Sequence, residues 1–290
     1  MGGEHRKGFW LTLGGVLAFT PDSLLIRLTA VDSFTLAFGR GILGGTVILL
    51  GFALYARSEF FGAVRNLGGW GALVCVLQAA CAIAFYAAFS YTSVANVLVI
   101  FACTPLIAAV LSKMIFNEGI SNATRWAIVG AALGLMVVAS GSLDSIQWFG
   151  DSLALLNATM LALLYTILRG HREINMVPAA GIGLLLTAVV ALMFAKFPVM
   201  DSVQWASLVL AGLVVLPLAL VLMTLGPRYL PAPEVAMISL LEAVLGPLWV
   251  WWVIGENPGW QTIAGGSVVI VVLMVHSAVR LRSEGRQVSR

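Results

Sequence analysis

The chain is short of charge: Asp, Glu, Lys and Arg make up 10% of its 290 residues, against roughly 25% in soluble globular domains. It has only three cysteines and three histidines, and none of them has the spacing of a metal site. A Walker motif and a paired nucleophile and base are also missing. These absences argue against a soluble domain, a metal or other cofactor site, direct use of ATP and an enzyme.

What the chain has instead is apolar sequence, at 60% of its residues and a mean hydropathy of +1.00. The apolar residues form ten successive runs, each about long enough for a helix to cross ~30 Å of hydrocarbon. Short connections leave no room for a separate domain, so we expect an all-α membrane protein whose function lies inside the bundle. The predicted spans are residues 9–27, 34–55, 69–91, 94–116, 125–141, 150–168, 177–197, 205–225, 232–254 and 260–281.

The basic residues predict the orientation. Of the 16 Lys and Arg residues, Arg40 lies within a span, Arg27 and Lys196 lie on one side of the membrane, and the other thirteen lie on the opposite side. This asymmetry requires ten spans, because nine would move the later loops to the other side. By the positive-inside rule, both termini are expected in the cytoplasm of a bacterial-type inner membrane, with residues 1–8 as one tail and 282–290 as a basic second tail.

The sequence also contains an internal repeat. Residues 91–118 align without a gap to residues 229–256, each segment running from a Tyr through an apolar span to a Glu, and residues 8–27 align to 150–169. The chain therefore divides into two halves of five spans, residues 9–141 and 150–281. Because five is an odd number, the second half enters the membrane from the opposite side, which predicts inverted repeats that rock between two states.

These features carry a resemblance to a known family. The chain resembles the drug/metabolite transporter superfamily, and within it the ten-helix EamA-type permeases, through Arg40 in the second span, Pro105 and Glu118 in the fourth, and Glu242 and Glu256 in the ninth. The resemblance covers nearly everything between the two tails.

One position departs from the family pattern. The Glu-Pro pair of the ninth span reads Glu242-Ala243 here, and a proline follows one turn later at Pro247. The bend of that span is therefore expected to be displaced.

The resemblance implies a secondary transporter that moves a small polar or zwitterionic metabolite, such as an amino acid or amine, by alternating access and usually outward. It also implies a central cavity between the halves. A passive channel or a lipid-handling membrane protein is the alternative, and proton coupling and a homodimer are left open.

Three ionisable residues lie well inside spans, where each costs roughly 2.5–3.5 kcal/mol on insertion scales and needs a partner or water. Asp22 and Arg40 lie at similar depths in adjacent antiparallel spans, which predicts a salt bridge. That pair is either a static clamp or a gating or substrate-binding pair. Pro21 removes a backbone hydrogen bond just before Asp22 and is expected to bend the first span.

The third of these residues, Glu242, lies near the middle of the ninth span with no cation in the same helix. It could bind and release a proton during transport or accept a substrate ammonium. Gln78 and Tyr86 in the third span are candidates for lining a cavity with it, and cation–π attraction would suit an amine. Pro105 and Pro247 are expected to bend their helices.

Other signals predict structure rather than chemistry. Glu118 and Glu256 lie on exit turns and are expected to cap helices or anchor loops. Residues 39–44 match a dinucleotide-binding GxGxxG pattern but lie inside a span, which argues against nucleotide binding. The GxxxG pairs at Gly41 and Gly45 and at Gly130 and Gly134 predict close helix packing instead. The basic tail is expected to contact anionic lipid and not nucleic acid.

Overall fold

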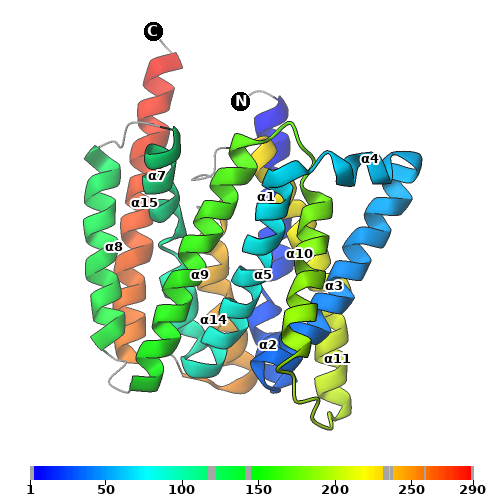
Figure 1. Cartoon of the computed structure of the whole chain (residues 1–290). Helices are drawn as coiled ribbons and strands as arrows, with labels where there is room; N and C mark the ends of the chain where they lie inside the picture. Colours follow the sequence, from blue (N-terminus) through cyan, green and yellow to red (C-terminus); the bar gives the residue numbers. More distant parts are fainter. Residues whose placement is uncertain are drawn as a thin grey trace.

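Each of the ten predicted spans contains helix in the computed structural model, which describes residues 3–116, 122–140, 145–230, 235, 238–257 and 259–288. Every regular element in these residues is helical, and the long helices lie side by side in one bundle (Figure 1). Six helical stretches in the described residues are long and apolar enough to cross a membrane. The predicted all-α, ten-span fold is confirmed.

The spans comprise, in chain order, α1 (Gly3–Phe19) with α2 (Asp22–Thr29), α3 (Ser33–Ala56), α5 (Gly68–Tyr91), α6 (Val94–Phe101) with α7 (Thr104–Phe116), α8 (Asn122–Ser140), α9 (Ser145–Gly170), α10 (Val177–Leu192), α11 (Ser202–Leu210) with the π-helix η2 (Ala211–Val215) and α12 (Leu216–Leu225), α14 (Leu240–Ile254) and α15 (Trp260–Val288). Short connecting elements are η1 (Arg57–Glu59), α4 (Phe60–Arg65) and η3 (Gly226–Arg228). Successive spans alternate in direction, so α1 begins and α15 ends on the same side of the bundle (Figure 1). We call this side the terminal face and the other the opposite face.

Two helix breaks are each formed by a threonine followed by a proline. The first span is interrupted at Thr20 and Pro21, and the fourth is interrupted just before Thr104 and Pro105. A proline has no N–H for the carbonyl four residues earlier. In both breaks the hydroxyl of the preceding threonine donates a hydrogen bond to that same carbonyl. Thr20 donates to Leu17 O at 3.0 Å, and Thr104 donates to Phe101 O at 2.6 Å. The freed backbone acceptors are thus satisfied inside the bundle.

The other prolines behave differently. Pro247 lies inside helix α14, which continues through it, so the displaced bend predicted there does not interrupt the helix. Pro217 follows the π-helix η2, a widened turn of the kind often found where a proline breaks the hydrogen-bond ladder. Hydropathy and motif spacing did not predict this turn.

The seventh span is shorter than predicted, because α10 ends at Leu192 and not near Phe197. The apolar residues that follow fold over the start of α3. The backbone amides of Lys196 and Phe197 donate to the Thr35 hydroxyl at 3.1 and 3.2 Å, and Phe197 has a positive φ of 46°. Hydropathy did not reveal this end because four of the five residues from Met193 to Phe197 are apolar, like the helix before them.

Helix pairs that join the two halves have the most extensive contacts in the described residues. They are α3 with α10 and α8 with α15, the second and fifth spans of each half. The contact of α5 with α9 has its counterpart in that of α1 with α12, as the swapped third and first spans of the two halves. This pattern is the one that inverted repeats require.

Glycine residues allow the helices of these pairs to approach closely. A Cβ atom on Gly41 would lie 2.6 Å from the Leu184 carbonyl oxygen of α10, and one on Gly134 would lie 2.9 Å from the Gly265 carbonyl oxygen of α15. Backbone groups are this near only because no side chain separates them. The predicted close packing at the GxxxG pairs is confirmed.

Replacing Gly41 by alanine is therefore expected to force α3 away from α10 and lower the melting midpoint in detergent by several degrees, consistent with overpacking costs of about 1–3 kcal/mol. Gly51 is a matched control in the same helix, since a Cβ there meets nothing within 4 Å. Gly51→Ala is expected to leave the midpoint unchanged or slightly raised. Equal midpoints for the two variants would contradict the close-packing account.

Candidate functional site

A cavity lies in the middle of the bundle, with walls from both halves of the chain. It holds about 840 Å³ free of protein atoms, part of it open to the surroundings. Most of the wall is apolar or aromatic, including Phe19, Phe85, Phe101 and Met223. The polar side chains on the wall are those of Gln78, Tyr86, Thr104, Asn157, Tyr165, Ser239 and Glu242. Phe19, Phe101 and Thr104 on the wall belong to the two threonine-proline breaks, so the irregular backbone borders the cavity.

Glu242 has the only ionisable carboxyl among the described residues that line the cavity. Its side chain is buried, at 6% exposure, and lies in the first turn of α14. Tyr165 and Asp22 are near enough to interact with it electrostatically. The negative charge of Asp22 repels a carboxylate at this position. A cation entering the cavity would relieve this repulsion.

Asp22 and Arg40 form the predicted ion pair, and both side chains are buried, at 1% and 0% exposure. The guanidinium carbon lies 5.1 Å from the centre of the Tyr86 ring, so the pair sits directly behind the cavity wall. Oδ2 of Asp22 and Nε and Nη1 of Arg40 have no hydrogen-bond partner among the described residues. The pair is therefore incompletely satisfied in this conformation.

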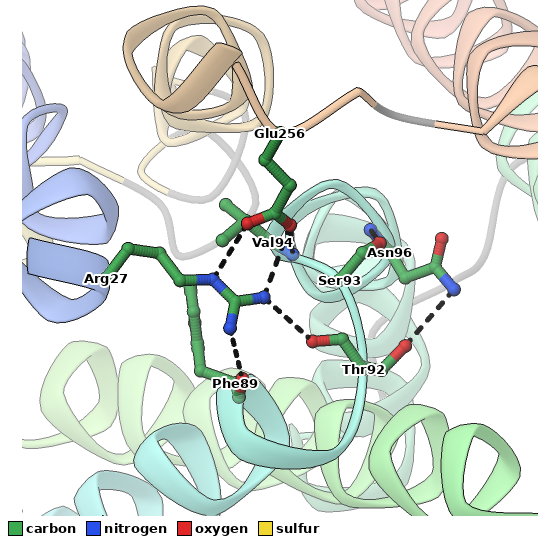
Figure 2. Close-up of polar contacts among 7 residues, drawn as sticks. All are labelled: Arg27, Phe89, Thr92, Ser93, Val94, Asn96 and Glu256. Carbon is green, nitrogen blue, oxygen red and sulfur yellow. Dashed lines mark hydrogen bonds and ion pairs between the residues drawn. The ribbon is translucent and has the colours of Figure 1, made fainter. Parts of the chain in front are cut away.

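A second ion pair lies at the opposite face of the bundle (Figure 2). Nε of Arg27, at the end of the first span, lies 3.0 Å from Oε2 of Glu256, just past the end of α14. Its Nη atoms donate to the backbone carbonyls of Phe89 at 3.1 Å and Thr92 at 3.2 Å. The Val94 amide, at the start of α6, donates to Oε1 of Glu256 at 3.2 Å. These five residues, the Arg27–Glu256 cluster, join four spans.

A buried polar network lies next to this cluster. The Thr92 hydroxyl donates to the Asp151 carboxylate at 2.8 Å, and the Asn96 amide donates to the same oxygen at 3.3 Å. The Thr262 hydroxyl donates to Asn96 Oδ1 at 2.6 Å. The network links the starts of α6, α9 and α15, so each half contributes to this face.

The structure brings three predicted site residues, Gln78, Tyr86 and Glu242, onto one cavity and places Asp22 and Arg40 behind it. Sequence reasoning missed Asn157, Tyr165 and Ser239 on the wall. A polar Asn157 in the middle of an apolar span was a usable signal.

The Arg27–Glu256 pair was also missed, because the two residues are far apart in the sequence. Glu256 does cap a helix, but the helix is α6 and not the one that follows it. Glu118 lies outside the described residues.

Comparison with known proteins agrees with this architecture. The model of the EamA-like transporter family matches the chain twice, over residues 6–140 and 148–278. A solved structure described as "Crystal structure of protein" superposes with a TM-score of 0.74 at 16% identity, covering 95% of this chain and 98% of that chain. At that identity the similarity establishes the fold alone. No curated protein sequence matches the chain.

Proposed function

The chain belongs to the EamA-like transporter family, and we propose that it carries a small amine or zwitterionic, amino-acid-like metabolite outward by alternating access. The observation that supports this most directly is the buried Glu242 carboxyl on a largely apolar and aromatic cavity wall. Among the described residues of the wall, no cation pairs with this carboxylate, and a carboxylate of this kind is suited to an ammonium group.

The rest of the wall suits the remainder of such a cargo. Phe85 and Tyr86 offer aromatic faces that attract a cation or pack on an apolar side chain, and Gln78 and Asn157 offer amides to polar groups. Arg40 is a cation close to the wall that could attract a cargo carboxylate, but it contacts the Tyr86 ring and does not itself line the cavity in this conformation. The proposal favours cargo with one ammonium and a modest apolar body.

We place the protein in a bacterial inner membrane with both termini in the cytoplasm, since the alternation of the spans along the sequence assigns thirteen Lys and Arg residues to the side of the termini. The opposite face, which holds the Arg27–Glu256 cluster, then lies outside. Closure of that face by the cluster belongs to one state of the cycle, and the cluster must break for the cavity to open outward. We propose that cargo transport is coupled to proton movement and that the Glu242 carboxyl carries the proton.

Breaking the cluster is therefore expected to open the cavity more often toward the opposite face. Arg27 and Glu256 are each a little over a quarter exposed, and pairs of this kind are worth roughly 0.2–1 kcal/mol. Glu256→Gln should raise that open population about 1.5- to 5-fold. Cys81 lines the cavity and is free, so its labelling by a membrane-impermeant thiol reagent added at the opposite face measures the change.

The labelling is done in a Cys75→Ser/Cys103→Ser background that leaves Cys81 as the single thiol. Glu173→Gln is the control, because it breaks the exposed Arg172–Glu173 pair, which lies on the terminal face away from the cavity. Unchanged Cys81 labelling in Glu256→Gln would contradict the proposal that the cluster breaks during the transport cycle.

The function itself is tested with purified protein in liposomes loaded with a mixed pool of amines and amino acids. Mass spectrometry follows which compounds leave, with and without a proton gradient. Selective, saturable loss with counterflow supports a carrier and names its cargo class. Unsaturable loss without counterflow supports the channel alternative, and no selective loss contradicts metabolite carriage for that pool.

A further inference from the structure

A second hollow lies outside the cargo cavity, on the other side of the eighth span. It holds about 1480 Å³ free of protein atoms, including space open to the surroundings, and α1, α3, α10 and α12 all contribute to its wall. We call it the lateral groove. Leu216 and Leu220 of α12 line the cavity, whereas Leu218 and Val221 of the same helix line the groove. The two spaces are therefore distinct.

The groove begins where α3 and the eighth span touch. A Cβ on Gly212 would lie 2.9 Å from the Leu43 side chain, so the helices are in close contact there. From this point toward the terminal face, Val47 and Gly51 of α3 face Val214 and Leu218 across the groove. Both Val214 and Leu218 are about half exposed. An exposed apolar wall along a membrane-spanning helix faces lipid chains and not water.

The terminal-face end of the groove is cationic. Lys7 and Arg228 line it, and no acidic residue lines it among the described residues. The Lys7 ammonium lies 4.9 Å from the centre of the Tyr229 ring. Nε of Arg228 donates a hydrogen bond to the Arg172 backbone carbonyl at 3.0 Å. The polar end thus combines two positive charges with an aromatic ring at the end of the groove nearest the terminal face.

Tight packing fixes the position of the cationic end. A Cβ on Gly8 would lie 2.6 Å from Cβ of Tyr229, so the start of α1 rests directly on the segment that carries Arg228 and Tyr229. Lys7 and Arg228 are consequently held at the same end of one groove although they are far apart in sequence.

We propose that the lateral groove binds an anionic phospholipid from the terminal-face leaflet, with its phosphate between Lys7 and Arg228 and an acyl chain along Val214 and Leu218. We infer this ligand because the lateral groove combines two positive charges at one end with an apolar wall along its length. The cations select a negative headgroup, since basic residues near the membrane surface attract anionic lipid. The apolar length selects a chain-bearing lipid over a free phosphate ion. This site is independent of the cargo that the central cavity takes.

The test measures lipid binding to purified protein by native mass spectrometry, with phosphatidylglycerol, phosphatidylcholine and inorganic phosphate as separate probes. We expect the wild type to retain phosphatidylglycerol preferentially. Each basic residue near a membrane surface contributes about fivefold in affinity, so Lys7→Gln/Arg228→Gln is expected to weaken phosphatidylglycerol binding about 30-fold. The matched control, Arg65→Gln/Lys113→Gln, removes two exposed cations outside the groove and should leave binding unchanged.

A third variant tests the apolar part and keeps both cations. Gly51→Phe places a ring in the groove, where a Cβ meets nothing within 4 Å, and it is expected to exclude the acyl chain and reduce phosphatidylglycerol binding at least tenfold. It also serves if the doubly substituted variant does not fold. Equal retention by the wild type and either groove variant, or binding of inorganic phosphate as strong as that of phosphatidylglycerol, would overturn the proposal.

Discussion

Replacing Glu242 by glutamine is expected to reduce transport of an amine cargo by roughly 10- to 150-fold, which corresponds to the 1.5–3 kcal/mol of a hydrogen bond to a charged group. Glutamine keeps the volume and the hydrogen-bonding ability of the side chain but removes its charge. Because Glu242 is the one carboxyl among the described cavity-lining residues, no neighbour on the wall replaces it. Initial rates of efflux from liposomes measure the loss.

Two readouts separate the roles proposed for this carboxyl. If Glu242 carries the coupled proton, Glu242→Gln loses its response to a proton gradient but still exchanges cargo for cargo. If it holds the cargo ammonium, exchange is lost as well. Glu59→Gln is the control, since Glu59 is exposed in η1. Wild-type flux and gradient response in Glu242→Gln would contradict both roles.

Removing one partner of the Asp22–Arg40 pair is expected to be the most destabilising single change in the bundle. A buried charge that loses its partner costs about 3–5 kcal/mol, and both side chains are almost fully buried. Asp22→Asn and Arg40→Met should each lower the melting midpoint in detergent sharply or prevent recovery of folded protein. Asp22→Leu/Arg40→Met, which removes both charges, should recover much of the lost stability.

The double variant also distinguishes a static clamp from a moving part. We expect it to fold and yet to transport at less than a tenth of the wild-type rate. The reason is that Oδ2 of Asp22 and two nitrogens of Arg40 lack partners in this conformation, as expected of groups that bond elsewhere in another state. Full transport by the folded double variant would make the pair a static clamp, the other alternative that the sequence left open.

Much of the fold followed from the sequence because a membrane allows few solutions. Backbone groups in hydrocarbon must bond within helices, so apolar run length located the spans. A charge inside a span needs a partner, so the pairing of Asp22 with Arg40 could be predicted from their depths in adjacent spans. Glycines four residues apart in α3 predicted a close helix contact, although the partner helix α10 could not be named.

The features that the sequence did not predict depend on which helices are neighbours in the bundle and on which side of each helix faces the cavity. The pairing of Arg27 with Glu256 requires the ends of the first and ninth spans to meet, and nothing local in either segment encodes that meeting. Tyr165 and Ser239 became cavity residues through the rotation of their helices about their own axes, which weakly amphipathic spans do not reveal. The end of α10 was missed because its boundary depends on a bond to Thr35 in another helix.

The seam between α3 and α10 has a consequence for how the protein is made. The ribosome delivers α3 to the membrane well over a hundred residues before α10, so the glycine face at Gly41 first meets lipid, which cannot fill it as closely as a helix backbone does. The amino-terminal half therefore lacks part of its helix packing when it is first inserted. The contact between α3 and α10 forms only after the second half has been synthesised. Separately expressed halves should accordingly be short-lived alone and rescue each other when both are present.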